Sequence, residues 1–184
     1  MKSYLPLFAI LLFLQSCDAF TDQRAVTKEE FYELKDNVTI TKVSEGKILE
    51  EATPKAQEIY KKIESKKVEI ISFLENNPSK QQELFQLIGL DSTQAELIEK
   101  IAYRKTASEA EYEKEKQIFK AYQNITDPTL YQENLQILHG KEKILYSYPN
   151  FDTESQKLGG VWSIILSQKE IIRSFKKEKK SRFG

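Results

Sequence analysis

The chain has one cysteine and one histidine among its 184 residues, Cys17 and His139. A lone cysteine forms no disulfide within the chain, so the fold must depend on its core. No second histidine or cysteine is present to complete a zinc or haem site. His139 stands just before a glycine that we expect to end a helix, where it would complement the negative end of the helix dipole.

Phosphate-binding and nucleophile motifs are also missing. The sequence contains no G-x-x-x-x-G-K-[ST], no G-x-G-x-x-G and no G-x-S-x-G. Basic and acidic residues balance at 28 each, so the net charge gives no reason to expect nucleic acid as a partner. We therefore predict no catalytic residue, no metal site and no cofactor, and we do not expect an enzyme.

Glycine and proline are scarce, at 6 and 5 residues, and lysine, glutamate, leucine and isoleucine are common, a mixture that favours helix. Apolar residues recur at three- and four-residue steps along most of the chain from Thr53 onward. The pattern predicts an all-α fold, a compact bundle of five or six helices after a polar N-terminal tether. The predicted helices lie within 53–76, 79–88, 91–105, 106–125, 127–139 and 161–177, with residues 141–160 irregular and Gly159-Gly160 as a turn.

One short stretch before the bundle has a different pattern. Residues 38–43, Val-Thr-Ile-Thr-Lys-Val, are β-branched and alternating, which is typical of a strand. A lone strand is unstable in water, so this stretch must dock on the body, pair with a partner or serve as an extended linker. We divide the chain into residues 1–16, a signal peptide, 17–53, a tether or extended segment, and 54–184, a helical domain with a basic C-terminal tail.

The N-terminus carries an apolar run of only ten residues, from Leu5 to Leu14, after a positive Lys2. About 20 residues are needed to cross a bilayer as a helix, so the run fits the apolar region of a secretory signal. Leu14-Gln15-Ser16-Cys17 follows, and it resembles the lipobox of bacterial lipoproteins. Gln15 departs from the small or aliphatic residue that is usual at its position.

The resemblance covers residues 1–17 and says nothing of the mature domain. It implies that the thiol of Cys17 is alkylated with diacylglycerol, that cleavage precedes Cys17, and that acyl chains such as palmitate hold the protein on a membrane. It also implies a location in the cell envelope, on the periplasmic or exterior face, and Asp18 favours the inner membrane by the sorting rule of enteric bacteria. Two alternatives remain open: plain secretion with cleavage after Ala19, and a buried cysteine in a cytosolic helix.

The C-terminal residues 169–184 carry seven basic and two acidic side chains, whereas residues 17–168 have an excess of six acidic ones. Such a tail suits anionic lipid headgroups, and it equally suits the negative end of a helix. The candidate membrane-surface residues are Lys176, Lys177, Lys179, Lys180 and Arg182.

Aromatic residues gather around the predicted loop at Pro149. Rigid aromatic side chains in loops often anchor protein partners. The alternative, which we favour, is that they fill the core. The candidate partner-binding residues are Tyr146, Tyr148, Phe151 and Trp162. The acidic residues Glu109, Glu111, Glu113 and Glu115 alternate with lysines, which favours a solvated helix face with ion pairs over a catalytic or metal-binding cluster.

These features together predict a membrane-anchored, exported lipoprotein that binds a protein partner without catalysis. Neutralising an incoming toxin or helping to assemble an envelope complex would suit such a protein. Two other functions stay open: an envelope hydrolase or transferase with paired carboxylates in a groove, and a carrier of a small apolar ligand held between helices.

Overall fold

The computed structural model describes residues 43–138, 140, 142–152 and 157–182, without the side chains of Pro128 and of residues 176–182. Contacts within the chain gather residues 43–184 into one compact unit. The α-helices are α3 (Glu45–Ser65), α4 (Lys67–Asn76), α5 (Gln81–Ile88), α6 (Ser92–Leu97), α7 (Glu113–Gln123) and α8 (Gln168–Arg182). The strands are β1 (Ile98–Arg104), β2 (Asn134–Leu138), β3 (Lys143–Asp152) and β4 (Lys157–Ser167), and short 3₁₀ turns, η2 (Ala107–Glu109) and η3 (Pro128–Leu130), lie between them.

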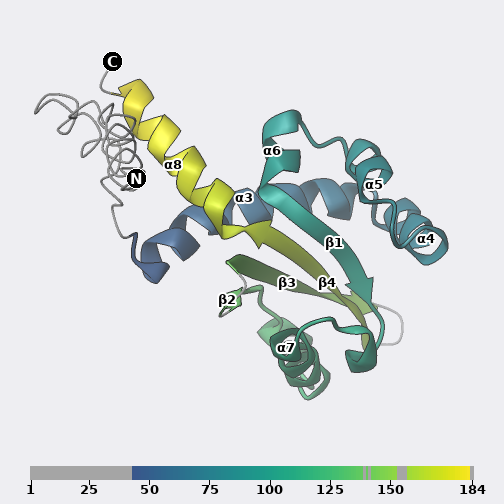
Figure 1. The fold of residues 1–184 in the computed structure, drawn as a ribbon. Coiled ribbons are helices and arrows are strands. Elements are labelled where there is room, and N and C mark those ends of the chain that lie inside the picture. Colours follow the sequence, from purple (N-terminus) through teal and green to yellow (C-terminus); the bar gives the residue numbers. More distant parts are fainter. Residues whose placement is uncertain (1–42, 139, 141, 153–156, 183–184) are drawn as a thin grey trace, which may run out of the picture. The chain divides into compact units, whose positions relative to one another are not determined.

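The prediction of an all-α bundle is wrong, because the centre of this unit is a four-stranded antiparallel sheet (Figure 1). The strand order is β1-β4-β3-β2, so β2, β3 and β4 form a meander and β1 joins the far side of β4. The helices predicted within residues 91–105 and 127–139 contain β1 and β2, and the stretch 141–160, expected to be irregular, contains β3.

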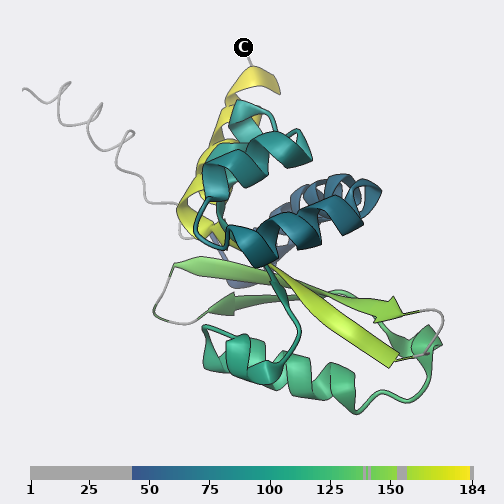
Figure 2. The ribbon, with the colours of Figure 1, turned by 90° about the vertical axis from the view of Figure 1, so that its right-hand side faces the viewer.

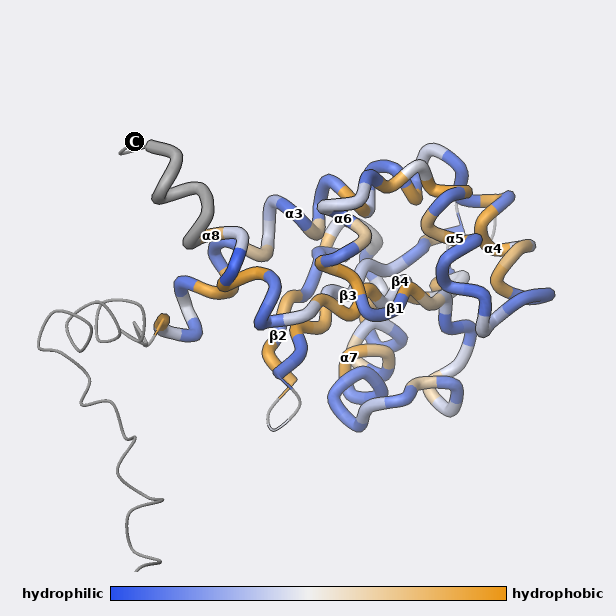
Figure 3. Tube along the Cα trace, turned by 45° about the horizontal axis from the view of Figure 1, so that its top comes forward, coloured by the Kyte–Doolittle hydropathy of each residue, from blue (hydrophilic) through white to orange (hydrophobic). Residues whose placement is uncertain are grey.

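Helices cover both faces of the sheet (Figure 2). On one face α3 packs against alternate strand residues, among them Ile144, Tyr146, Trp162 and Ile164. On the opposite face α7 contributes a second cluster with Leu145, Val161 and Ile165. Because β3 and β4 are covered on both sides, their residues are apolar on both faces, and they form an orange centre in the hydropathy view (Figure 3).

Several predicted helices are present with shifted bounds. Helix α5 ends at Gly89, whose φ of 78° is the left-handed conformation that glycine adopts without strain. Asp91 caps α6 and forms a capping box with Gln94. The single helix predicted over 53–76 is two helices, because α3 ends at Ser65 and α4 begins at Lys67. Helix α3 also begins at Glu45 and not at Thr53, so Pro54 lies inside it.

The first part of the last predicted helix, 161–177, is a strand in the structure. Residues up to Ser167 belong to β4, and α8 begins at Gln168. Gly159-Gly160 is part of β4 and not a turn. An added Cβ at Gly160 would lie 2.4 Å from Cζ of Tyr103, so the glycine makes room for that ring.

Candidate functional site

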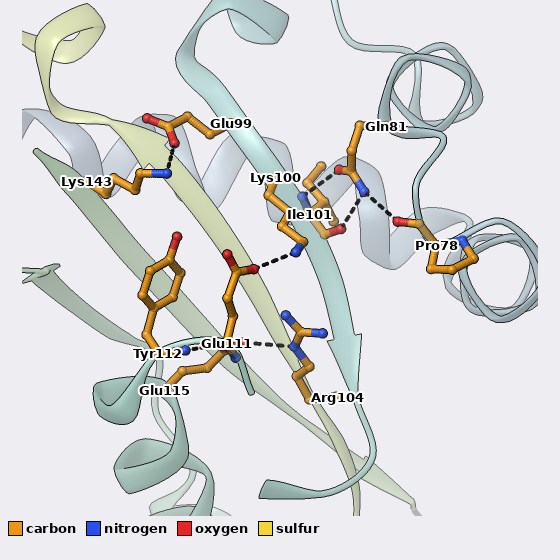
Figure 4. Close-up of polar contacts among 10 residues, drawn as sticks. All are labelled: Pro78, Gln81, Glu99, Lys100, Ile101, Arg104, Glu111, Tyr112, Glu115 and Lys143. Carbon is orange, nitrogen blue, oxygen red and sulfur yellow. Dashed lines mark hydrogen bonds and ion pairs between the residues drawn. The ribbon is translucent and has the colours of Figure 1, made fainter. Parts of the chain in front are cut away.

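Strand β1 forms one edge of the sheet, and a side chain from α5 covers part of that edge. The backbone N–H of Ile101 donates to Oε1 of Gln81 at 2.8 Å, and Nε2 of Gln81 donates back to the carbonyl of Ile101 at 3.2 Å (Figure 4). The amide of Gln81 thus takes the place that a residue of a neighbouring strand would occupy. Native proteins often cover edge strands in such ways, because an open edge invites pairing with another chain.

A second side chain covers the chain just beyond the end of β1. The backbone N–H of Lys105 donates to Oε2 of Glu109 in η2 at 2.8 Å. Between the two covered positions lies Tyr103, which pairs with Trp162 on β4. Backbone groups along a strand alternate in direction, so those of Tyr103 face outward like those of Ile101. Within the described part of the chain, no hydrogen bond reaches them from that side.

A groove of about 380 Å³ borders this open position. One wall comes from α4 and the loop that follows it, and the other from the end of β1 and η2. The lining residues are Ile71, Leu74, Glu75, Pro78, Tyr103, Arg104, Lys105 and Glu109. The groove therefore combines an apolar wall, charged groups and a backbone position free to form hydrogen bonds.

The charges of the groove are mostly paired. Lys105 forms an ion pair with Glu75, and the hydrogen bond with Glu75 raises the pKa of Lys105. Arg104 donates from Nε to Oε1 of Glu115 at 3.0 Å. The carboxylate of Glu109 accepts from the backbone of Lys105 and from Thr106, and it has no ion pair with any described residue. Glu109 is thus the acidic side chain of the groove without an ion pair to a described residue at contact distance, although its charge acts on nearby Lys105.

On the α7 side of β1, ion pairs join the strand to the acidic stretch. Glu115 is only 3% exposed, and besides Arg104 it accepts from the backbone N–H of Glu111 at 2.8 Å. Lys100 pairs with Glu111 at 2.5 Å and lowers the pKa of that carboxyl (Figure 4). The acidic stretch forms ion pairs, but it is not the solvated helix face that the sequence suggested, because Glu115 is buried. Glu111, which precedes α7, and Glu115 both pair with residues of β1. Among the described residues, no group of histidine, cysteine and carboxylate side chains is arranged to hold a metal ion.

The four aromatic residues proposed from the sequence do not form one surface. Trp162 and Tyr146 are 0% and 1% exposed and belong to the core. Tyr148 is half-buried and its ring stacks on that of Tyr60, with centroids 4.1 Å apart. Phe151, also half-buried, packs against Tyr131 in the cluster on the other side of the sheet.

Two tyrosine hydroxyls near this aromatic group donate to carboxylates. Tyr146 donates to Oε2 of Glu133 at 2.7 Å, and Tyr60 donates to Oε2 of Glu64 at 2.7 Å. Burial raises the pKa of both hydroxyls far above the usual range, and the neighbouring carboxylates raise it further. The hydroxyls and carboxylates satisfy one another, so the group is a packed polar network.

Several proposed residues or their side chains are not among those that the structure describes. Cys17, Asp18 and His139 lie outside the described residues, as does all of the strand-like stretch except Val43. Lys176, Lys177, Lys179, Lys180 and Arg182 belong to α8, in the part whose side chains are not described. A second hollow, of about 460 Å³, lies at the start of α8 and is lined by Glu142, Gln168, Lys169, Ile172 and Arg173.

No sequence pattern indicates Gln81, Tyr103 or Glu109 as site residues. They come together only because β1 is a strand at a sheet edge.

Comparison of the chain with protein-family models, with curated proteins and with solved structures finds no match. In the described part of the chain, no helix combines the length and apolar character that a membrane span requires.

Proposed function

We propose that this chain is an exported lipoprotein, held on a membrane through Cys17, whose folded unit binds a protein partner at the β1 groove without catalysing a reaction. The lipobox-like sequence before Cys17 supports the anchor. The groove supports the binding role. An incoming toxin, or a component of an envelope complex, is the kind of partner that a binder confined to the membrane would meet.

One observation carries the binding role. The outward backbone groups of Tyr103 form no hydrogen bond within the described part of the chain, although Gln81 and Glu109 cover the positions two residues to either side. Backbone groups at an open sheet edge can pair with another chain, and a partner that fills the groove would supply these bonds in place of water. Exposed edge backbone beside a groove is also where proteins recognise extended segments of other chains.

Site-specific photocross-linking in the native host tests this role. The full chain carries a photoreactive amino acid at Ser79, which is exposed and adjoins Pro78 in the groove. A matched chain carries it at Gln117, which is exposed on α7 at the opposite face of the sheet. We expect a discrete adduct of higher mass from position 79 and none from position 117. No adduct from position 79, or the same adducts from both positions, would contradict the proposed site.

A further inference from the structure

We infer that the partner enters the groove as an extended segment and pairs with β1 through the backbone of Tyr103 alone. This inference rests on the proposed function and specifies how the partner is recognised. The segment would accept a hydrogen bond from the N–H of Tyr103 and donate one to its carbonyl, as in an antiparallel or a parallel ladder.

The side chains that cover the edge limit the length of this pairing. Gln81 satisfies both backbone groups of Ile101, and Glu109 satisfies the N–H of Lys105. At roughly 3.3 Å per residue, the uncovered stretch between these positions spans about 13 Å of strand. A long strand cannot add to this edge without displacing Gln81 or Glu109. A short extended segment fits, and it must leave the edge at both ends.

The groove also specifies the side chains of the segment. Successive side chains of an extended segment point to opposite sides. A side chain directed at the wall formed by Ile71, Leu74 and Pro78 meets apolar surface. A side chain directed at η2 meets Glu109, the carboxylate in the groove that no described cation pairs with. The complementary segment therefore carries an apolar residue next to a lysine or arginine.

A phage library of random nonapeptides supplies a probe of stated chemistry for a partner whose identity is not established. The full chain in detergent micelles is used for selection, and the most enriched peptide is synthesised with a fluorescent label. Fluorescence anisotropy measures the affinity of this peptide for the parent chain and for semisynthetic chains. In each semisynthetic chain, one backbone amide is replaced by an ester. An ester at Tyr103 removes that N–H and keeps the side chain. The matched control is an ester at Ile101, whose N–H already bonds to Gln81.

We expect enriched peptides with an apolar residue next to a basic one. The ester at Tyr103 should weaken binding about three- to tenfold, the effect of losing one hydrogen bond, and the ester at Ile101 should leave binding unchanged. Glu109→Gln keeps an acceptor for the N–H of Lys105 and removes the charge, so it should weaken binding about threefold, with a smaller effect at high salt.

Three results would overturn the inference. They are the absence of any enriched peptide, equal loss of affinity with both esters, and self-association of the chain that the ester at Tyr103 abolishes, which would identify a second copy as the occupant. Failure of this inference can be distinguished from failure of the proposed function. If position 79 still cross-links a partner in the host while the ester at Tyr103 has no effect, the groove binds a protein but not by strand pairing.

Discussion

The ring of Tyr103 lies against the backbone of Gly160, on the strand that pairs with β1. A Cβ at residue 160 would stand 2.4 Å from Cζ of Tyr103 and 2.8 Å from the carbonyl oxygen of Arg104. The hydroxyl of Tyr103 in turn accepts a hydrogen bond from Nδ2 of Asn150 at 2.8 Å. Because residue 160 has no side chain, the ring of Tyr103 can lie over β4 at that position. This contact holds Tyr103, whose backbone borders the groove, in place.

Gly160→Ala should destabilise the fold and disturb the groove. The new methyl group meets backbone as well as a ring, so β1 must shift, at a cost of about 1–3 kcal/mol in the free energy of unfolding. Gly159→Ala is the matched control, because its Cβ would approach no atom closer than 3.4 Å. Urea denaturation of both variants measures the effect. Equal stability of the two variants would show that the ring does not lie over residue 160.

The ion pair between Arg104 and Glu115 should matter more than the other charges around β1. Its side chains are only 16% and 4% exposed. Glu115→Ala leaves Arg104 without its partner in a largely buried position, and it should lower the free energy of unfolding by about 3 kcal/mol. Glu113→Ala, which removes a side chain that is 72% exposed, should cost less than about 0.5 kcal/mol. Thermal or urea unfolding compares the two variants, and a similar loss in both would contradict the buried pair.

Alkaline pH should destabilise the folded unit through three tyrosines, of which Tyr122 and Tyr146 are buried and Tyr60 is half-buried. Burial and nearby carboxylates raise the pKa values of Tyr60 and Tyr146, and burial raises that of Tyr122, above the ordinary 10.0. A raised pKa in the folded state stabilises the protein at pH values below 10.0, and that contribution is lost as the pH rises above it.

Tyrosinate absorbance and circular dichroism, recorded on the same samples, check this prediction. We expect three tyrosines to resist ionisation just above pH 10.0 and to ionise together with unfolding. Tyr146→Phe should remove one of these late-ionising groups. Ionisation of every tyrosine in the folded state near its ordinary pKa would contradict the predicted network.

The anchor is tested at Cys17. The variant Cys17→Ser removes the nucleophile that the lipobox-like sequence would supply, so the chain should lose its acyl additions and leave the membrane fraction. The intact mass of the membrane-extracted parent chain should correspond to a polypeptide that begins at Cys17 and carries acyl groups. Unchanged processing and membrane association of the variant would exclude lipidation as the anchor.

The helices of the first half could be predicted from the sequence because their signals are local. The cap at Asp91, the glycine at residue 89 and the apolar stripe of α3 depend on neighbours within one or two turns. The sheet could not be predicted in the same way. In β1 the register shifts between Ile98 and Lys100, and this irregularity places Ile98, Ile101 and Tyr103 against the same core. The resulting three-residue step has the spacing of a helix.

The other strands were missed for a related reason. Strand β4 contains the run Val161-Trp162-Ser163-Ile164-Ile165-Leu166, in which only Ser163 is polar. Both faces of the strand are covered, so the run lacks the regular alternation of polar and apolar residues that marks a strand with one exposed face. Tyr146 and Trp162 lie in the core, which is the interpretation favoured from the sequence, although they reach it on strands and not under a loop. The groove depends on Gln81, Tyr103 and Glu109 meeting at a sheet edge, and no sequence spacing indicates that meeting.

Amide hydrogen exchange at Tyr103 tests the central claim most directly. In the free chain, its N–H should exchange much faster than those of Ala102 and Arg104, which face β4, and than that of Ile101, which Gln81 covers. On addition of the partner or of the selected peptide, exchange at Tyr103 should slow by about tenfold or more, while exchange at Ile101 should not change. A Tyr103 amide that is already protected in the free chain, or that is unaffected by a bound partner, would contradict the account.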